Sequence, residues 1–284
     1  MIRRSLRNAS AISAAAAILF TMSVDTAAAG EPSGPTPLDR AHAHNDYEHD
    51  RPLLDALDHG FGSVEADVWF VDGQLLVAHD EDDVDPERTL QSLYLDPLRQ
   101  IVADNGGAVY PGWDGSLQLL IDIKSDGEET YLAVDSVLAE YADIMTRFAN
   151  GDVETGAVTA VISGNRPREV MEEQEVRYAG YDGRLSDLGA DTPADFMPLV
   201  SDNWTDHFSW VGIGDMPAEE RDKLHDIVAQ AHDSGYQVRF WATPDAALPN
   251  REAVWRELVD AEVDYLNSDD LPGLRDFLLE YESA

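Results

Sequence analysis

Residues 41–80 read AHAHNDYEHDRPLLDALDHGFGSVEADVWFVDGQLLVAHD, and the spacing of their polar side chains decides the fold. His42 and His44 stand two residues apart. Glu65 and Asp67 repeat this spacing in the next strand-like segment. Because alternate residues of a β-strand share a face, each pair points to one side and its apolar neighbours to the other. Strands of this kind indicate a site at the mouth of a barrel.

The rest of the chain alternates strand-like segments with segments of helical periodicity. The run LQLLIDIK at 117–124 is nearly all apolar, as is typical of a buried parallel strand. We expect eight strands at 40–44, 63–70, 117–124, 157–163, 176–181, 196–201, 237–241 and 263–267, plus a return strand at 74–78 after an Asp72-Gly73 turn. We expect helices from 52, over 89–103 and 128–148, from 167, over 217–234 and 251–261, and from 271.

This alternation predicts an α/β fold, namely a (β/α)8 TIM barrel, because eight strand–helix units fit a chain of roughly 250 residues. The alternative is a doubly wound open sheet. That fold commonly carries a glycine-rich phosphate loop after its first strand, and no such loop follows residues 40–44. In a barrel, functional side chains project from the carboxyl ends of the strands.

The first 29 residues have the features of a secretory signal peptide. Arginines precede an apolar run at 11–24, and Ala27-Ala28-Ala29 offers a small-residue cleavage site. Residues 30–37 are then expected to be a flexible leader, and 38–284 a single domain. We therefore expect a protein secreted after cleavage near Ala29. The absence of cysteine excludes disulfides, a thiol nucleophile and thiolate metal sites.

The composition is strongly acidic, with 56 acidic and 19 basic residues and a formal net charge of −37. Such a chain cannot replace the counterions along a nucleic acid, so a nucleic-acid partner is excluded. The same charge disfavours docking on anionic lipid, although a local basic pocket can still bind one phosphate group. We expect a monomer with a heavily solvated surface and no stable membrane insertion.

The predicted strand ends bring together the ligands of a hard cation. Glu65 and Asp67 come from the second expected strand, and Asp122 comes from the third. Three carboxylates from neighbouring strands, completed by water, suit one Mg²⁺ or Ca²⁺.

Histidines and a lysine surround this predicted cation site. His79 follows the hairpin, and His42 and His44 end the first strand, so that two imidazoles can serve as acid and base. Lys124 can place its charge against a phosphate oxygen. Together these groups indicate cleavage of a phosphodiester.

Three segments together resemble the glycerophosphodiester phosphodiesterase and phosphatidylinositol phospholipase C-like superfamily. They are the first histidines, the stretch SVEADVWFVDGQLLVAHD at 63–80, and LLIDIK at 119–124. The HNDY opening at 44–47 is closest to the branch that includes the yeast mitochondrial-inheritance-type proteins. The resemblance implies a barrel with metal ligands at Glu65, Asp67 and Asp122 and a catalytic histidine at His79.

A second part of the resemblance concerns substrate binding. An aspartate followed two residues later by lysine, as in Asp122 and Lys124, resembles the venom phospholipase D branch, where the lysine contacts phosphate. Trp241 stands where that branch has an aromatic residue at the site.

The first strand departs from the pattern of most relatives, which have His-Arg-Gly there. Either His44 or His42 can then be the first catalytic histidine. We favour His44, because its spacing to Glu65 is close to that of the venom branch. Asn45 is a further candidate for substrate binding.

Three other classes of protein need consideration. A His-x-His pair also binds zinc in amidohydrolase and phosphoesterase barrels, but those sites need later histidines that this chain does not place at strand ends. A glycosidase needs two carboxylates across the barrel, whereas Glu65 and Asp67 are neighbours. A non-catalytic binding barrel would have lost a histidine or a carboxylate, and this chain keeps the full set. We therefore expect a secreted, metal-dependent phosphoric diester hydrolase acting on glycerophosphodiesters or phospholipid headgroups.

Overall fold

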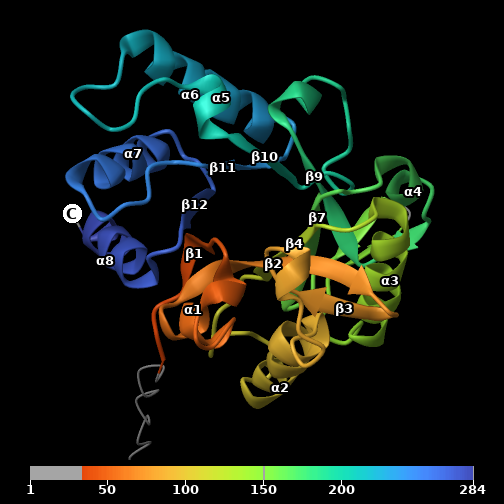
Figure 1. Cartoon of the computed structure of the whole chain (residues 1–284). Coiled ribbons are helices and arrows are strands. Elements are labelled where there is room, and N and C mark those ends of the chain that lie inside the picture. Colours follow the sequence, from red (N-terminus) through yellow and green to blue (C-terminus); the bar gives the residue numbers. More distant parts are fainter. Residues whose placement is uncertain (1–33, 150, 284) are drawn as a thin grey trace, which may run out of the picture. The chain divides into compact units, whose positions relative to one another are not determined.

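The computed structural model describes residues 34–149 and 151–283, which belong to one compact unit. The predicted signal peptide and the first part of the leader lie outside these residues. Within them, eight parallel strands close into a barrel in the order β1-β2-β4-β7-β9-β10-β11-β12, with β12 pairing back to β1 (Figure 1). The predicted (β/α)8 fold is confirmed.

The strands follow the expected order along the chain. The barrel strands are β1 (Leu38–Ala43), β2 (Phe61–Val71), β4 (Leu117–Ile123), β7 (Val158–Gly164), β9 (Ala179–Gly183), β10 (Leu199–Asn203), β11 (Gln237–Trp241) and β12 (Tyr265–Ser268). The expected return strand, β3 (Gln74–Val77), pairs antiparallel with β2 across the Asp72-Gly73 turn.

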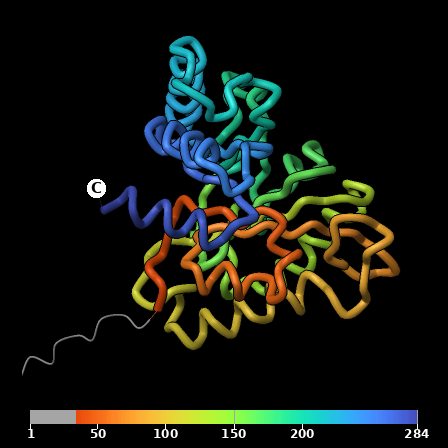
Figure 2. Tube along the Cα trace, turned by 60° about the vertical axis from the view of Figure 1, so that its left-hand side comes forward, coloured from red at the N-terminus to blue at the C-terminus, as the bar shows by residue number. Residues whose placement is uncertain are grey.

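Helices join successive strands and cover the outside of the barrel. They are α1 (Leu54–Asp58), α2 (Asp96–Asp104), α3 (Gly127–Glu140), α4 (Arg168–Glu172), α5 (Trp204–His207), α6 (Ala218–Asp233), α7 (Pro249–Asp260) and α8 (Leu271–Glu282), with short turns η1 (Asp46–Glu48), η2 (Glu81–Asp83), η3 (Gln91–Leu95) and η4 (Leu185–Asp187). Figure 2 shows the first strand lying beside the last helix. None of the described helices is long and apolar enough to cross a membrane.

The hydrophobic core has two parts. The larger part lies between the strands and the helices, and includes the fully buried Trp204 and Trp255. The smaller part consists of four side chains: Leu120, Val161, Leu199 and Tyr265. These four come from alternate residues of their strands on the same face as the polar site residues, so they pack inside the barrel. They form an apolar layer on which the polar residues of the strand ends rest.

The prediction fails in the middle of the chain. Helix α3 ends at Glu140, not at Phe148, and Phe148 lies in β5 (Arg147–Ala149). This strand forms a small antiparallel sheet with β6 (Asp152–Glu154) and β8 (Val176–Arg177). The apolar residues there have a spacing that also fits a helix, but pairing of β5 with β6, which follows it directly, and with β8 overrides local preference.

Two strand boundaries also differ from expectation for the same reason. The expected strand 176–181 is divided between β8 of the small sheet and β9 of the barrel. The expected strand 196–201 begins only at Leu199, where pairing with Asp182 of β9 starts.

A buried carboxyl holds the loop that follows the first strand. Asp46 is fully buried, and its Oδ2 accepts hydrogen bonds from the Leu53 N–H (2.6 Å) and the Tyr94 hydroxyl (2.9 Å). Its Oδ1 is buried without a partner. Burial raises the pKa of Asp46 to about 7, against the opposing effect of the two hydrogen bonds.

We expect Asp46→Asn to remove a pH-dependent loss of stability. Because the folded-state pKa lies above the unfolded value, the stabilisation by this group is complete below about pH 4 and is lost as the pH rises through about 7. The amide keeps an acceptor and never ionises. The difference in free energy of unfolding between the variant and the wild type should therefore grow by roughly 2 to 4 kcal/mol, in favour of the variant, from pH 5 to pH 8. Urea unfolding at both pH values measures this. The same pH dependence in both proteins would contradict it.

Candidate active site

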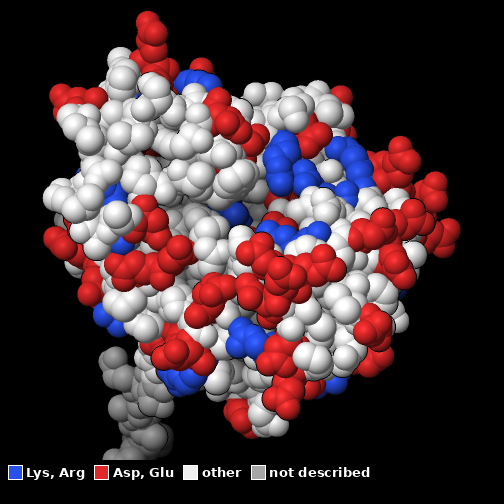
Figure 3. Space-filling view, in the orientation of Figure 1, with Lys and Arg blue, Asp and Glu red and all other residues white. Residues whose placement is uncertain are grey.

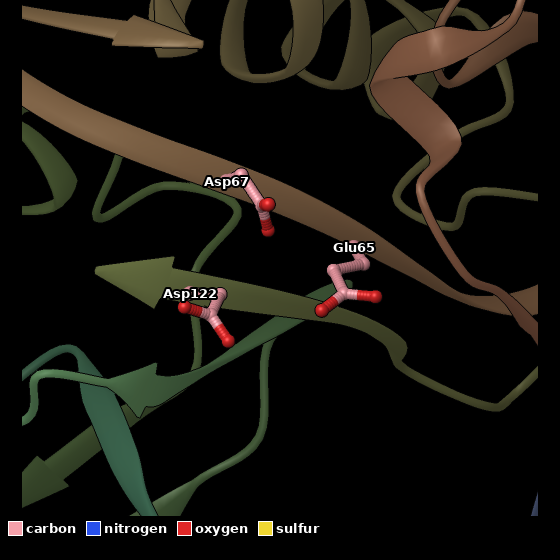
Figure 4. Close-up of side chains that lie close together, drawn as sticks. All are labelled: Glu65, Asp67 and Asp122. Carbon is pink, nitrogen blue, oxygen red and sulfur yellow. The ribbon is translucent and has the colours of Figure 1, made fainter. Parts of the chain in front are cut away.

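Three carboxylates meet on two neighbouring strands, near the carboxyl end of the stretch over which these strands pair (Figure 4). Glu65 and Asp67 alternate on β2, and the parallel register sets Asp67 opposite Asp122 on β4. One oxygen of each carboxylate lies within 4.8 Å of the others. The strand-pair geometry thus brings together the three residues expected to bind a metal.

The surroundings of the three carboxyl groups shift their pKa values in different directions. Burial and the charge of Glu65 raise the pKa of Asp67 to about 6, and burial also raises the pKa of Asp122. Burial acts in the same direction on Glu65, but His42 and the charge of Arg239 outweigh it and hold the pKa of Glu65 well below its usual range. The Oδ1 atom of Asp67 is buried without a hydrogen-bond partner. A buried group of this kind lacks a cation or proton to balance it.

Lys124 supplies part of the missing charge. Its Nζ lies 3.1 Å from Asp67 Oδ2 and 3.1 Å from Asp122 Oδ1. Burial alone would lower the pKa of Lys124, but the two carboxylates raise it, so the ammonium stays charged. The Lys124 side chain thus lies at the rim of the carboxylate cluster. Its expected contact with a phosphate oxygen stays a prediction.

A pocket of about 240 Å³ opens above the cluster. Eight of its eleven lining residues are site residues predicted from the sequence: His44, Asn45, Glu65, Asp67, His79, Asp122, Lys124 and Trp241. Ser163, Arg184 and Arg239 complete the lining. His42 is the one predicted site residue outside this lining.

His44 faces the pocket because the first strand ends just before it, at Ala43. Its Nδ1 lies 2.7 Å from Asp269 Oδ1, and its Nε2 lies 3.8 Å from Glu65 Oε2. Burial lowers the pKa of His44, but the hydrogen bond to Asp269 and the charge of Glu65 raise it above its ordinary value. The ring is therefore oriented and favoured as the imidazolium.

His42 lies below the pocket in the barrel interior and is fully buried. Its Nδ1 lies 2.7 Å from Ser63 Oγ, and its Nε2 lies 3.1 Å from an Arg239 nitrogen. Burial and the charge of Arg239 lower the pKa of His42 to about 4. Both ring nitrogens are occupied, so of the two histidines on the first strand, His44 has the geometry of an acid or base.

His79 is the second histidine at the rim, with 58% of its side chain exposed. Its Nδ1 lies 3.2 Å from Asp67 Oδ2 and 3.1 Å from the Tyr47 hydroxyl. That hydroxyl also lies 2.7 Å from Asp67 Oδ2 and 2.8 Å from the Asn45 side-chain oxygen. Because Nδ1 is the atom that contacts these groups, Nε2 is left to meet a substrate.

The remaining predicted residues lie at the rim. Asn45 adopts a left-handed conformation (φ 49°), which asparagine tolerates, and its amide nitrogen donates to Asp269 Oδ1 (3.2 Å). In the structure this side chain therefore orients other site groups, and its predicted contact with substrate stays a prediction. Trp241 lines the pocket at the end of β11.

Several groups of the site were not predicted from the sequence. Asp269 is not among the predicted site residues, yet its carboxylate orients His44. Arg184 is paired with Asp182 at 2.8 Å on the end of β9. Arg239 stands two residues before Trp241 on β11, so the alternation that placed Glu65 and Asp67 would also have placed Arg239 on the inner face.

Basic side chains are concentrated near this site although the chain is acidic. Figure 3 shows Lys and Arg gathered over β7 and β9, while groups of Asp and Glu are spread among uncharged residues over the rest of the same face. Arg166, for example, lies over the Tyr181 ring at 5.0 Å. A local positive field of this kind favours approach of an anionic ligand.

A zinc site built on the His-x-His pair is not supported. In the described part of the chain, the one group of three or more candidate ligands is the carboxylate cluster, and it contains no histidine. His42 and His44 are divided between the barrel interior and the rim.

The closed barrel, with its carboxylate cluster beside two rim histidines, agrees with the resemblance to the phospholipase C-like phosphodiesterase superfamily. Comparison of the sequence with family models agrees. The AIM6-like phosphodiesterase domain matches residues 36–182, and the glycerophosphoryl diester phosphodiesterase family matches residues 237–272. The chain belongs to the AIM6-like phosphodiesterase family.

Several curated relatives are similar over most of the chain. Altered inheritance of mitochondria protein 6 of Eremothecium gossypii is 32% identical, covering 84% of this chain and 69% of the relative. A homolog from Arthroderma benhamiae is 30% identical and covers 81% of both chains. The protein from Lachancea thermotolerans is 31% identical, and the match spans 82% of this chain and 64% of that relative.

Solved structures give a weaker likeness. A glycerophosphoryl diester phosphodiesterase from Parabacteroides distasonis is 12% identical, with a TM-score of 0.49 over 88% of this chain and 89% of that chain. A putative one from Agrobacterium tumefaciens is 14% identical, with a TM-score of 0.47 over 88% and 100%. The assignment of the barrel fold therefore rests on the strand pairing alone, and these two likenesses add nothing to it.

Proposed function

We propose that this phosphodiesterase domain hydrolyses glycerophosphodiesters or phospholipid headgroups with one divalent cation, Mg²⁺ or Ca²⁺, and two histidines. The observation that carries the proposal is the cluster of three buried or half-buried carboxylates, which lies between His44 and His79 in one pocket. An acid–base pair beside a cation site is well suited to cleavage of a phosphodiester.

The donor set fits a hard cation. Glu65, Asp67 and Asp122 offer oxygen atoms alone, and the unpartnered Asp67 Oδ1 is available to a ligand. Oxygen-only sites of this charge suit Mg²⁺ or Ca²⁺ better than zinc. A bound cation would stabilise the negative charge that develops on the phosphoryl oxygens.

The chain's own residues move the protons and hold the substrate. One histidine removes a proton from the attacking hydroxyl, which belongs either to water or to the substrate itself. The other protonates the leaving alcohol oxygen as the P–O bond breaks. Lys124 adds a positive charge beside the phosphoryl group, and Trp241 forms a wall of the pocket.

The proposed setting is outside the cytoplasm. The amino-terminal sequence supports secretion, and the net charge of −37 disfavours anionic membrane surfaces. Both features favour soluble glycerophosphodiesters or zwitterionic headgroups as substrates, acted on by a monomer.

The test is hydrolysis of bis(p-nitrophenyl) phosphate and a panel of glycerophosphodiesters, with Mg²⁺ or Ca²⁺ and then with EDTA. We expect turnover that EDTA removes and that His79→Ala lowers by on the order of a thousandfold. His225→Ala, an exposed change on α6, is the matched control and should keep full activity. No turnover of any ester, with no cation bound in calorimetry, would refute the proposal.

A further inference from the structure

Arg239 is a buried arginine in the wall of the pocket. It lies on the inner face of β11 and is 4% exposed, yet its side chain lines the cavity above the carboxylate cluster. A charged group this deep in a protein requires a partner, because its loss of hydration is otherwise uncompensated.

The partner present is a neutral one. An Arg239 guanidinium nitrogen lies 3.1 Å from His42 Nε2, and the Nε of Arg239 is buried without any hydrogen-bond partner. No carboxylate of the described residues lies within ion-pair distance of Arg239, although its charge is near enough to Glu65 to lower the pKa of that carboxyl. By contrast, Lys124 and Arg184 both form ion pairs.

The hydrogen-bond directions show why His42 is a fitting partner. Arginine only donates, so His42 Nε2 accepts and the proton of the neutral ring is on Nδ1, which donates to Ser63 Oγ. Gln118 Nε2 donates to the same Ser63 oxygen at 2.9 Å. These buried hydrogen bonds fix the orientation of the His42 ring, and the ring in turn holds one edge of the Arg239 guanidinium.

We propose that Arg239 binds a non-bridging oxygen of the substrate phosphoryl group and that His42 is the residue that positions it. The inference rests on the proposed phosphodiesterase function and deepens it. Arg239 comes from β11, whereas Lys124 directly follows β4, so the two positively charged side chains reach the pocket from different strands of the barrel. His42, the buried histidine of the His-x-His pair, then has a role without exchanging protons with substrate.

A planar guanidinium presents a fork of donors that matches two oxygens of one phosphate, which an ammonium cannot reproduce. The anion would supply the missing counter-charge. This predicts that an inorganic anion of the same shape binds the resting protein.

The experiment is calorimetric titration of the full chain with inorganic phosphate in the presence of Mg²⁺. We expect Arg239→Lys to weaken phosphate binding by about tenfold or more, which corresponds to one hydrogen bond to a charged group. Arg177→Lys is the matched control. Arg177 is also buried, at 7% exposure, but lies on β8 outside the pocket. It should leave phosphate binding unchanged.

Equal phosphate binding by the wild type and Arg239→Lys would overturn the inference, as would no binding by the wild type. Turnover of bis(p-nitrophenyl) phosphate, measured in parallel, separates the two proposals: phosphate bound through Arg239 without turnover refutes the hydrolase alone. If Arg239→Lys does not fold, a crystal of the wild type soaked in tungstate decides. The anion should contact the guanidinium, and an anion elsewhere in the pocket would overturn the inference.

Discussion

Asp122→Asn should abolish cation-dependent turnover, with a loss on the order of a thousandfold or more. The change keeps the shape of the side chain but removes one of the three clustered negative charges. A hard cation prefers charged oxygens, so its affinity should fall together with the rate. In the wild type, Mg²⁺ or Ca²⁺ should raise the melting temperature, because a ligand that binds only the folded state stabilises it. Asp122→Asn should lose most of this rise.

Asp104→Asn is the matched control, because it makes the same chemical change at an exposed position of α2. It should keep both turnover and the cation-induced rise in melting temperature. Without a cation, Asp122→Asn is expected to be no less stable than the wild type, since burial and neighbouring negative charge oppose ionisation of Asp122. A variant that keeps the full response to the cation would show that Asp122 is not a ligand.

The carboxylate cluster could be predicted from the sequence because strand register follows from local patterns. Glu65 and Asp67 share a face through the two-residue period, and the apolar run at 117–124 identified the neighbouring parallel strand. Parallel pairing then sets Asp67 opposite Asp122. No knowledge of distant loops was needed.

The first strand shows where this reasoning stops. Spacing alone gives His42 and His44 the same face. The difference between them arises because the strand ends at Ala43 and the chain turns through the left-handed Asn45. His44 thereby reaches the rim, while His42 stays in the interior. A strand boundary shifted by one residue decides this, and boundaries are set by tertiary pairing that local sequence does not specify.

Arg239 was missed for another reason. Its alternation with Trp241 was readable, but a lone arginine in a strand gave no sign of a partner, because His42 is 197 residues away along the chain. The interior of a barrel is also commonly filled by apolar side chains. Here, an apolar layer below is covered by a polar layer above it. The order of those layers depends on the closed ring, which single strands do not reveal.

The roles of His44 and His79 can be separated by the leaving group of the substrate. We expect His44 to be the acid, because Asp269 and Glu65 favour its imidazolium form. A p-nitrophenolate departs without receiving a proton, whereas the alkoxide of a glycerophosphodiester needs one. His44→Ala should therefore lower turnover of glycerophosphocholine by on the order of a thousandfold, and turnover of bis(p-nitrophenyl) phosphate far less.

The base is needed for both substrates, so His79→Ala should lower the two rates by similar factors. The Asp67 carboxylate and the Tyr47 hydroxyl contact His79 through Nδ1, which leaves Nε2 free to accept a proton from the attacking hydroxyl. Rates on both substrates, measured for the two variants at one pH and a saturating concentration of cation, give the comparison. Selective loss of the alkyl substrate in His79→Ala would reverse the assignment. If each variant instead lost the same factor on both substrates, neither proton transfer would depend on the leaving group. His44 would then act through Glu65 rather than on the substrate.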